Sequence, residues 1–288
     1  MKKIVSFGEI LLRLSTEGQQ RFSQAGSYRC NYGGAEFNVA MALAGYGVNS
    51  ELISRLPNND LGENALMEMR KHKLGIKNIL RGGERLGLYF LETGSGLRAS
   101  KVIYDRAHSA MATIEKGSIN WQEIFKNADW FHWSGITPAI SQQAADVCLE
   151  ALKAANGLGL TISVDLNYRA RLWNYGKKPA EVMPELLQYC NIMLGDLDTS
   201  CLMLGREKMN PDYTNIQSLA GSYDQLFSYC KNLSIAATTL RHSVHASHQK
   251  IGGLLYDGST IYSSKLSDVS PVVDRIGSGD AFMAGLIY

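Results

Sequence analysis

A glycine-containing turn close to the C-terminal end constrains the fold of this chain more than any other feature. It lies in residues 274–282, which read DRIGSGDAF. Residues 271–273 before it are predicted to be extended, and residues 281–287 after it are predicted to be helical. Glycines let the backbone approach a ligand closely, and the first free N–H groups of the helix point at that ligand. The turn therefore predicts an anion-binding site.

An acidic residue, Asp280, stands in the first turn of this predicted helix. A carboxylate repels a bound phosphate, so its position suggests a chemical role: it would accept the proton of a hydroxyl group that attacks the phosphate. Two other interpretations stay open. Asp is common at the start of any helix because it complements the helix dipole. A dinucleotide-binding turn also contains such glycines, although it requires a further Gly or Ala and a later acidic residue.

The stretch resembles the C-terminal signature of the ribokinase-like (PfkB) carbohydrate kinases: an Asp, then Gly-Ala/Ser-Gly-Asp, then an aromatic residue. The resemblance implies that Asp280 is the catalytic base. The amides of Gly277, Ser278 and Gly279 would hold the transferred phosphoryl group. Arg275 stands where the family usually has Thr. The implied fold is ribokinase-like α/β, with a doubly wound, mostly parallel central sheet, helices on both faces and a small β-sheet lid.

The composition suits a globular protein that acts on small molecules. The chain has 288 residues, of which 45% are hydrophobic and 19% charged, so a sizeable core is expected. A net charge of +2 without basic runs gives no reason to expect nucleic acid or a membrane as partner. Five widely spaced cysteines without a Cys-x-x-Cys pair predict the reduced thiols of a cytoplasmic protein. No apolar stretch approaches the roughly eighteen residues that cross a bilayer.

A second glycine turn, at Gly33 and Gly34, precedes a helix of small residues predicted over residues 37–45. Close packing of this helix on a sheet explains the turn as well as ligand binding does. In the resembled family this is the N-terminal signature, in which a glycine and a following asparagine contact substrate hydroxyls. Gly34 and Asn38 occupy the matching positions.

Residues 86–92 and 101–106 are predicted to form two strands joined by a Gly/Ser-rich turn. Alternation along a strand places Tyr104 and Arg106 on one face, and Tyr89 can face the same side across the hairpin. This face suits a substrate with hydroxyls at one end and a carboxylate at the other, because Arg pairs with carboxylates bidentately. The competing interpretation is an exposed, salt-bridged arginine beside ordinary strand tyrosines.

A long helix over residues 142–156 and a strand over residues 160–167 indicate a parallel sheet with right-handed crossovers. Ligands gather beyond the carboxyl ends of such strands. Asp165, Asn167 and Arg169 are displayed there at a spacing of two. The pattern is similar to that of the 2-keto-3-deoxygluconate kinases within the family, in which the arginine helps to bind the carboxylate of the sugar acid.

Acidic residues after the short strand at 192–194 are candidates for a metal site. Most family members carry Asn-x-x-Glu there, whereas this chain has Asp196 and Thr199. Asp196 and Asp198 suit hydrated Mg²⁺, which accepts few protein ligands. Helix capping is the alternative. The resemblance also implies a monovalent cation such as K⁺ near Asp274.

The strand predicted over residues 234–241 ends at Arg241, where the family usually has a glycine beside the nucleotide phosphates. Arg241 is therefore expected to pair with phosphate. His242, His245 and His248 recur at a spacing of three, but in a strand or loop this spacing points to alternate faces, and no Cys or acid completes a zinc set. We expect no zinc site.

The resemblance covers the whole chain and implies one ribokinase-like domain, residues 1–288, with a discontinuous β lid at about residues 11–32 and 85–106. The C-terminal part of the usual family domain is expected to be absent. Family lids often exchange strands between protomers, which implies a homodimer. The implied reaction transfers the γ-phosphate of ATP, with Mg²⁺, to the 6-hydroxyl of 2-dehydro-3-deoxy-D-gluconate. Two alternatives stay open: a kinase for a neutral sugar such as fructose or ribose, and a non-catalytic sugar-acid-binding protein.

Overall fold

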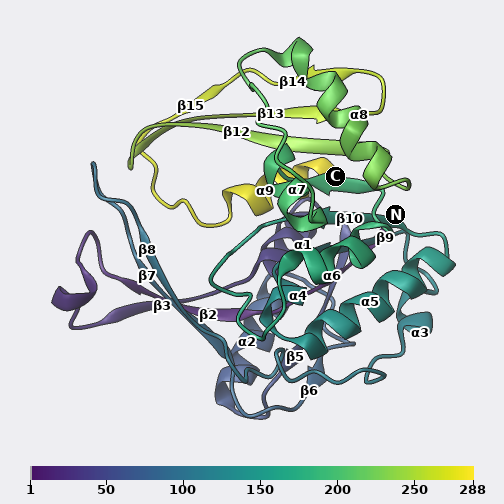
Figure 1. Cartoon of the computed structure of the whole chain (residues 1–288). Helices are drawn as coiled ribbons and strands as arrows, with labels where there is room; N and C mark the ends of the chain where they lie inside the picture. The colour runs from purple at the N-terminus through teal and green to yellow at the C-terminus, as the bar shows by residue number, and fades with distance from the viewer. Residues whose placement is uncertain (1) are drawn as a thin grey trace.

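A computed structural model describes residues 2–288 and shows a large sheet covered by helices, with a smaller sheet projecting from it (Figure 1). In these residues the large sheet has the strand order β14-β13-β12-β11-β10-β9-β1-β4, and β15 pairs with β13. Its strands are β1 (Lys3–Phe7), β4 (Asn49–Ile53), β9 (Trp130–Ser134), β10 (Thr161–Asp165), β11 (Ile192–Leu194), β12 (Ile235–His245), β13 (His248–Tyr256), β14 (Ile261–Ser263) and β15 (Ser267–Val269). The pairs from β4 to β12 are parallel, and the pairs made by β13 are antiparallel.

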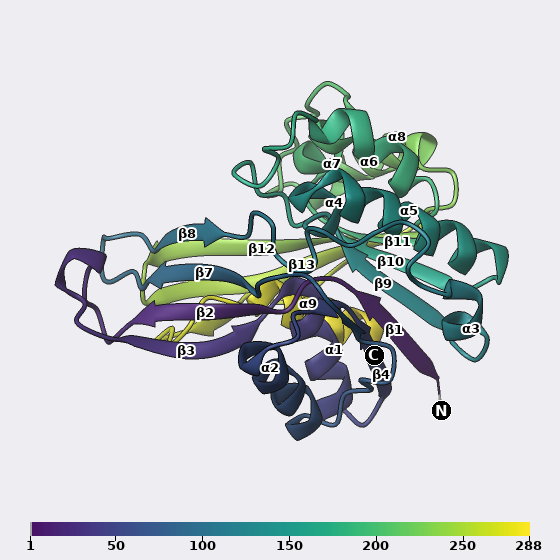
Figure 2. The same ribbon diagram turned by 90° about the horizontal axis from the view of Figure 1, so that it is seen from below.

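Helices cover both faces of this sheet, as the view in Figure 2 shows. On one side lie α1 (Ala35–Gly45), α2 (Asp60–Lys71) and α9 (Ser278–Ile287). On the other side lie α3 (Trp121–Phe125), α4 (Thr137–Ile140), α5 (Gln142–Gly157), α6 (Pro179–Leu187), α7 (Leu197–Leu204) and α8 (Ala220–Tyr229). Shorter elements are the 3₁₀ helices η1 (Phe22–Gln24) and η2 (Ile216–Leu219) and the strand pair β5 (Arg55–Leu56) and β6 (Leu80–Arg81). The doubly wound, mostly parallel α/β fold is confirmed.

The amphipathic pattern of α5 explains why it packs on the sheet. Val147, Ala151 and Leu152 are completely buried in the main hydrophobic core. Ser141 begins the helix, because its hydroxyl accepts a hydrogen bond from the amide of Ala144 at 3.0 Å. On the opposite face a smaller cluster joins Leu43 of α1 to Met283 of α9, so the two glycine turns of the sequence are brought to one edge of the sheet.

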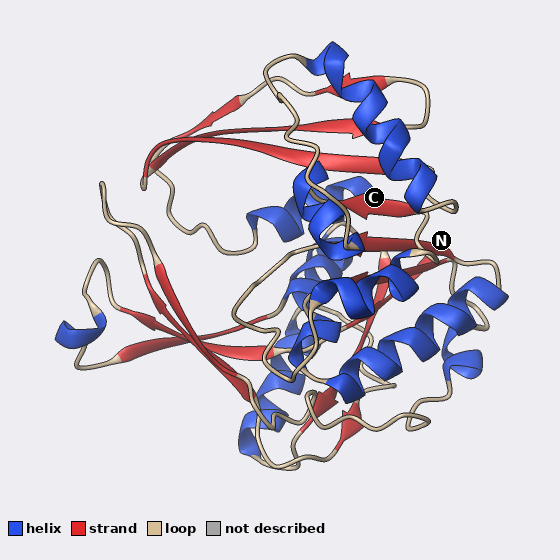
Figure 3. Ribbon diagram, in the orientation of Figure 1, coloured by secondary structure: helices blue, strands red, loops and turns tan. Residues whose placement is uncertain are grey.

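The smaller sheet has the order β3-β2-β7-β8. Its strands are β2 (Leu11–Thr16), β3 (Tyr28–Gly33), β7 (Gly87–Glu92) and β8 (Lys101–Asp105), and they come from the two segments predicted for a lid. Figure 3 shows this projecting part built almost entirely of strands and loops, whereas the helices gather around the large sheet. The β12–β13 hairpin projects on the same side, and its tip meets the lid: the amide of Ala246 donates to the carbonyl of Gly96 at 2.8 Å.

Two local features differ from what the sequence suggests. Strand β8 ends at Asp105, so Arg106 lies just beyond it. Residues 207–223 are largely polar, yet Leu219 and Tyr223 are buried in the main core. The apolar side chains of this segment are too few to give a clear helical period. Within residues 2–288, no helix is long and apolar enough to cross a membrane.

Candidate active site

The main cavity, of about 490 Å³, opens between the lid and the carboxyl ends of the central strands. It brings together the two glycine turns, the lid tyrosines and the polar residues that follow β10. Among the predicted site residues, those that line it are Gly34, Asn38, Tyr89, Tyr104, Arg106, Asn167, Arg169, Asp196, Arg241, Gly277, Ser278, Gly279 and Asp280. Residues from widely separated segments of the chain therefore line one cavity.

The C-terminal turn forms as the sequence predicts, at the start of α9. Gly277 is the N-cap residue in the left-handed conformation (φ 86°), and its carbonyl accepts the amide of Ala281 at 2.8 Å. A side chain at this φ would be strained, which explains the glycine. Helix α9 begins at Ser278, so the free amides of its first turn and the side chain of Asp280 face the same cavity. The turn thus places an anion-binding site next to a side chain that can accept a proton.

Asp280 is only 8% exposed, and burial raises its pKa to about 6. The side-chain amide of Asn38 opposes this shift by donating to Oδ2 of Asp280 at 2.6 Å, and the positive charge of Arg169 opposes it further. A carboxyl group with this pKa is mostly ionised at neutral pH, and it can therefore accept a proton during a reaction. Asp280 therefore has the properties of a general base.

Gly34 begins α1, and close packing explains why this position is a glycine. A Cβ atom there would lie 2.1 Å from the carbonyl oxygen of Glu9. Four residues later, Asn38 faces the cavity and Asp280. The glycine thus lets the helix lie close to the strand connection, and the asparagine is the polar group that this helix presents to a ligand.

The two lid tyrosines lie as predicted. Tyr89 and Tyr104 are direct partners in the β7–β8 pair, with ring centroids 6.4 Å apart, and both line the cavity. Burial raises the pKa of Tyr89 to about 12, so its hydroxyl stays protonated. The pair presents two phenolic groups that can donate to and accept from hydroxyl groups of a ligand.

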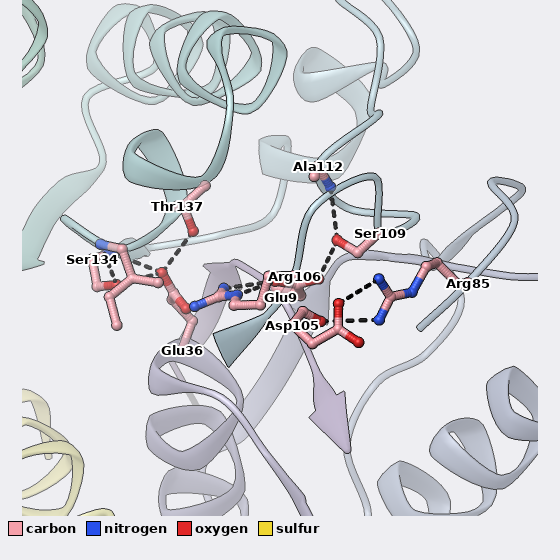
Figure 4. Close-up of polar contacts among 10 residues, drawn as sticks. Glu9, Glu36, Arg85, Asp105, Arg106, Ser109, Ala112, Ser134 and Thr137 are labelled. Atoms are coloured by element: carbon pink, nitrogen blue, oxygen red, sulfur yellow. Dashed lines mark hydrogen bonds and ion pairs between the residues drawn. The ribbon is translucent and has the colours of Figure 1, made fainter. Parts of the chain in front are cut away.

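Arg106 lines the cavity, but its side chain is buried and paired rather than free on the face of the lid. It is 6% exposed, and its guanidinium forms a buried ion pair with Glu9: Nη2 and Nε lie 2.6 and 2.7 Å from Oε2. Glu9 also accepts a hydrogen bond from Ser109 at 2.5 Å (Figure 4). Arg106 therefore lines the cavity with its charge already partnered. The alternative of a salt-bridged Arg106 is thus confirmed, except that the bridge is buried and not exposed. A separate ion pair on the surface joins Arg85 to Asp105 at 2.7 Å.

A second buried carboxyl group, Glu36, lies beside this pair (Figure 4). Its Oε1 accepts from the hydroxyls of Ser134 and Thr137 at 2.6 and 2.8 Å and from the amide of Ser134 at 3.1 Å. Burial raises its pKa, while these hydrogen bonds oppose the shift. The contacts fix the start of α1 to the end of β9. Sequence reasoning missed Glu9 and Glu36, since their partners lie 97 to 101 residues away.

Asp165, Asn167 and Arg169 line the cavity at and just beyond the carboxyl end of β10, as their place after a parallel strand predicted. Asp165 accepts the amide of Asn167 at 3.0 Å. Burial, followed by the negative charge of Asp280, raises the pKa of Asp165 to about 7. The sequence places Asp165 at this strand end but assigns no role to its carboxyl group. Two carboxyl groups of perturbed pKa and one arginine thus face the same ligand volume.

Positive charge gathers on the opposite side of the turn. Arg241 donates from Nη2 to the hydroxyl of Ser278 at 2.5 Å. Burial lowers the pKa of Arg241, and the nearby charges of Arg275 and Arg169 lower it further. Arg275, which the sequence marked only as a departure from the family pattern, lines the cavity as well. Three neighbouring guanidinium groups favour an anionic ligand here.

The three acidic residues considered for cations have other partners. Asp196 is the N-cap of α7 and accepts the amide and hydroxyl of Thr199 at 2.9 and 2.6 Å. It lines the cavity, so a hydrated ion remains within reach of its carboxylate. Asp198 instead accepts the amides of Met209 and Asn210, both at 3.0 Å. Asp274 pairs with Arg13 at 2.8 Å. Across residues 2–288, no group of three or more His, Cys, Asp or Glu side chains is arranged to hold a metal ion.

Comparison with known proteins adds independent information. The sequence model of the pfkB family carbohydrate kinases matches residues 1–227. A 2-dehydro-3-deoxygalactonokinase of Haloferax volcanii is 31% identical over 287 residues, which cover 99% of this chain and 83% of that protein. A 2-dehydro-3-deoxygluconokinase of Bacillus subtilis is 25% identical over 285 residues, covering 98% and 81%. The crystal structure of 2-dehydro-3-deoxygluconokinase from Thermotoga maritima superposes with a TM-score of 0.93 at 37% identity, covering 100% of this chain and 87% of that one.

Proposed function

Because this chain belongs to the pfkB family of carbohydrate kinases, we propose that it phosphorylates a 2-dehydro-3-deoxy sugar acid at its 6-hydroxyl with ATP. The proposed substrate is 2-dehydro-3-deoxy-D-gluconate, and the product is its 6-phosphate. One observation carries the proposal. The cavity joins a carboxyl group of pKa about 6 at a helix start, Asp280, to two tyrosines and a group of arginines. This arrangement suits a ligand with a reactive hydroxyl at one end and a carboxylate at the other.

In the proposed reaction, Asp280 accepts the proton of the 6-hydroxyl as its oxygen forms a bond to the γ-phosphorus of ATP. The bond from that phosphorus to the β-phosphate oxygen breaks, and ADP leaves. The free amides at the start of α9 and the guanidinium of Arg241 stabilise the charge on the phosphoryl oxygens. Hydrated Mg²⁺, for which Asp196 is the candidate ligand through water, would neutralise charge on the bound phosphates.

The carboxylate of the substrate is proposed to bind Arg169 in preference to Arg106. The guanidinium of Arg106 is paired with the carboxylate of Glu9, whereas Arg169 faces the cavity and donates a 3.3 Å bond to the carbonyl of Tyr168. Tyr89, Tyr104, Asn38 and Asn167 would bind the hydroxyl groups. Relatives named for the gluconate and galactonate forms both match this chain. The two acids differ in configuration at C4, so the polar group that meets the 4-hydroxyl decides between them.

The expected homodimer and the expected K⁺ remain predictions. Apolar side chains on the lid, among them Tyr28 and Ile103, are exposed by 38% and 44%, which would favour contact with a second lid. Both oxygens of Asp274 already have partners, Arg13 and the amide of Ile276. A monovalent cation at this carboxylate would share its oxygens with these two partners.

Phosphorus NMR tests the proposed function. The purified chain is incubated with ATP, Mg²⁺ and 2-dehydro-3-deoxygluconate, and the proton–phosphorus correlations of the product are recorded. We expect a new phosphate monoester coupled to the protons on C6, formed together with ADP. A phosphate coupled to another carbon would contradict the assigned position, and release of inorganic phosphate alone would contradict phosphoryl transfer to the acid.

A further inference from the structure

Arg13 connects the lid to the turn that carries Asp280, although in the described part of the chain it does not belong to the lining of the main cavity. It lies in β2, and its side chain is 16% exposed. Its Nη1 donates to Oδ2 of Asp274 at 2.8 Å, across 261 residues of sequence. Its Nη2 makes a longer bond, 3.4 Å, to Oδ1 of Asn31 on the neighbouring strand. The guanidinium is thus held by the lid and reaches the C-terminal glycine turn, residues 274–282, which we call the signature turn.

Asp274 shapes the turn through its other oxygen. Oδ1 accepts the amide of Ile276 at 2.9 Å, immediately before Gly277 turns the chain into α9. The first helical turn then presents its amides and Asp280 to the cavity. The carboxylate that Arg13 binds therefore fixes the entry to the anion-binding turn, and a displacement of Asp274 would displace the groups that follow.

On the lid side, Arg13 is the register partner of Tyr89 in the β2–β7 pair. Partners in adjacent strands project from the same face of a sheet, so the guanidinium lies beside the phenol that faces the cavity. The charge of Arg13 lowers the pKa of Tyr89, against the larger effect of burial. Arg13 therefore stands between a residue proposed to bind the sugar acid and the turn proposed to hold the phosphoryl group.

A second connection between lid and turn does not use Arg13. The amide of Ala246, at the tip of the β12–β13 hairpin, donates to the carbonyl of Gly96 in the lid at 2.8 Å. The carbonyl of Ala246 in turn accepts from Nε of Arg275 at 3.2 Å. Because this connection remains when Arg13 is replaced, the lid should keep its place, and the loss should be local to the signature turn.

We propose that Arg13 is a positioning residue, which sets the signature turn through Asp274 when the lid covers the sugar acid. The proposal rests on the proposed function for its substrate. It predicts that ligand contacts with Tyr89 are coupled to the geometry of the phosphate-binding amides, since one guanidinium lies between the two. Removal of the ion pair should therefore reduce turnover more than it reduces binding of either substrate.

Hydrogen exchange on the protein without ligands tests the connection itself. Arg13→Gln removes the cation, and Asp274→Asn removes the anion while it keeps an oxygen for the amide of Ile276. Arg29→Gln is the matched control, since Arg29 is an exposed arginine on the lid strand β3. We expect peptides covering residues 274–282 to exchange roughly threefold or more faster in the first two variants and unchanged in the control. Exchange equal to the wild type in both variants would overturn the proposal.

Kinetics then separate positioning from a general structural role. Arg13→Gln should lower kcat roughly tenfold or more while it changes the KM for ATP little, and Arg13→Lys should restore part of the kcat because it keeps a cation beside Asp274. A kcat equal to that of Arg29→Gln would overturn the positioning role. If the wild-type chain phosphorylates no sugar acid, the proposed function fails, and the exchange measurement still decides whether Arg13 holds the turn.

Discussion

The side-chain amide of Asn38 donates a hydrogen bond to Oδ2 of Asp280 at 2.6 Å and thereby joins α1 to α9 across 242 residues of sequence. The bond brings the two glycine turns together at the point where chemistry is proposed. It also holds one carboxylate oxygen in place and leaves the other available to a ligand.

Replacing Asp280 by Asn should remove turnover and leave sugar-acid binding nearly intact. Asn preserves the size of the side chain but cannot accept the proton, so kcat should fall roughly 10²- to 10⁴-fold. Calorimetric titration with the sugar acid, beside the kcat measurement, checks this. A kcat within a few-fold of the wild type would reject Asp280 as the base.

Replacing Asn38 by Ala should move the acidic limb of the pH–rate profile to higher pH. The wild-type limb of kcat/KM is expected near pH 6, the pKa of Asp280. The Asn38 hydrogen bond favours the ionised carboxylate and so lowers that pKa; its removal must raise it. Initial rates measured from pH 5 to 9 give both limbs. An unshifted or downward-shifted limb would contradict the assignment of this pKa to Asp280.

Replacing Asp165 by Asn should stabilise the protein at pH 8 but not at pH 4. The pKa of Asp165 is raised to about 7 in the fold, so the folded state binds the proton more tightly than the unfolded state does. The stability that this carboxyl group contributes is therefore largest at low pH and is lost as pH rises from about 4 to 7. The variant avoids this loss, which is on the order of 4 kcal/mol for a rise from an ordinary pKa of about 4 to about 7. Melting temperatures at both pH values test it, and an equal difference at pH 4 and 8 would count against the buried, protonated Asp165.

Arg106 and Arg169 should respond differently to replacement by Gln. Arg106→Gln leaves the buried carboxylate of Glu9 without its partner and should cost about 3–5 kcal/mol of stability. Arg169→Gln should leave the melting temperature nearly unchanged and raise the KM for the sugar acid roughly 10- to 100-fold, with little effect on the KM for ATP.

The double variant Glu9→Gln/Arg106→Gln is the control for this comparison. It removes both buried charges, so much of the stability lost in Arg106→Gln should return. Equal effects of Arg169→Gln on the KM values for the sugar acid and ATP would contradict a carboxylate-binding role for Arg169.

Much of the fold and of the site followed from short-range patterns. The turn that contains Gly277, the strand–helix order and the period of two that pairs Tyr89 with Tyr104 are all local features of the sequence. The family, and the ribokinase-like fold that the resemblance implied, are confirmed. The site residues then meet because the carboxyl ends of parallel strands lie at one edge of a sheet.

What the sequence could not provide are the partners of buried charges. Nothing near Arg106 in the chain indicates that Glu9 binds it, because ion pairs across 97 residues leave no periodic signal. The same is true of Arg13 and Asp274. The elevated pKa of Asp165 also depends on burial and on the charge of Asp280, which only the folded arrangement creates. These long-range contacts change how the arginines of the site are interpreted.

The specificity constants for two acids and two neutral sugars distinguish a sugar-acid kinase from a neutral-sugar kinase. ADP release is measured with 2-dehydro-3-deoxygluconate, 2-dehydro-3-deoxygalactonate, fructose and ribose at saturating ATP and Mg²⁺. We expect kcat/KM for at least one acid to exceed that for either neutral sugar by roughly 100-fold or more, since an arginine–carboxylate contact contributes about 3 kcal/mol. Equal or greater kcat/KM for fructose or ribose would contradict the sugar-acid kinase.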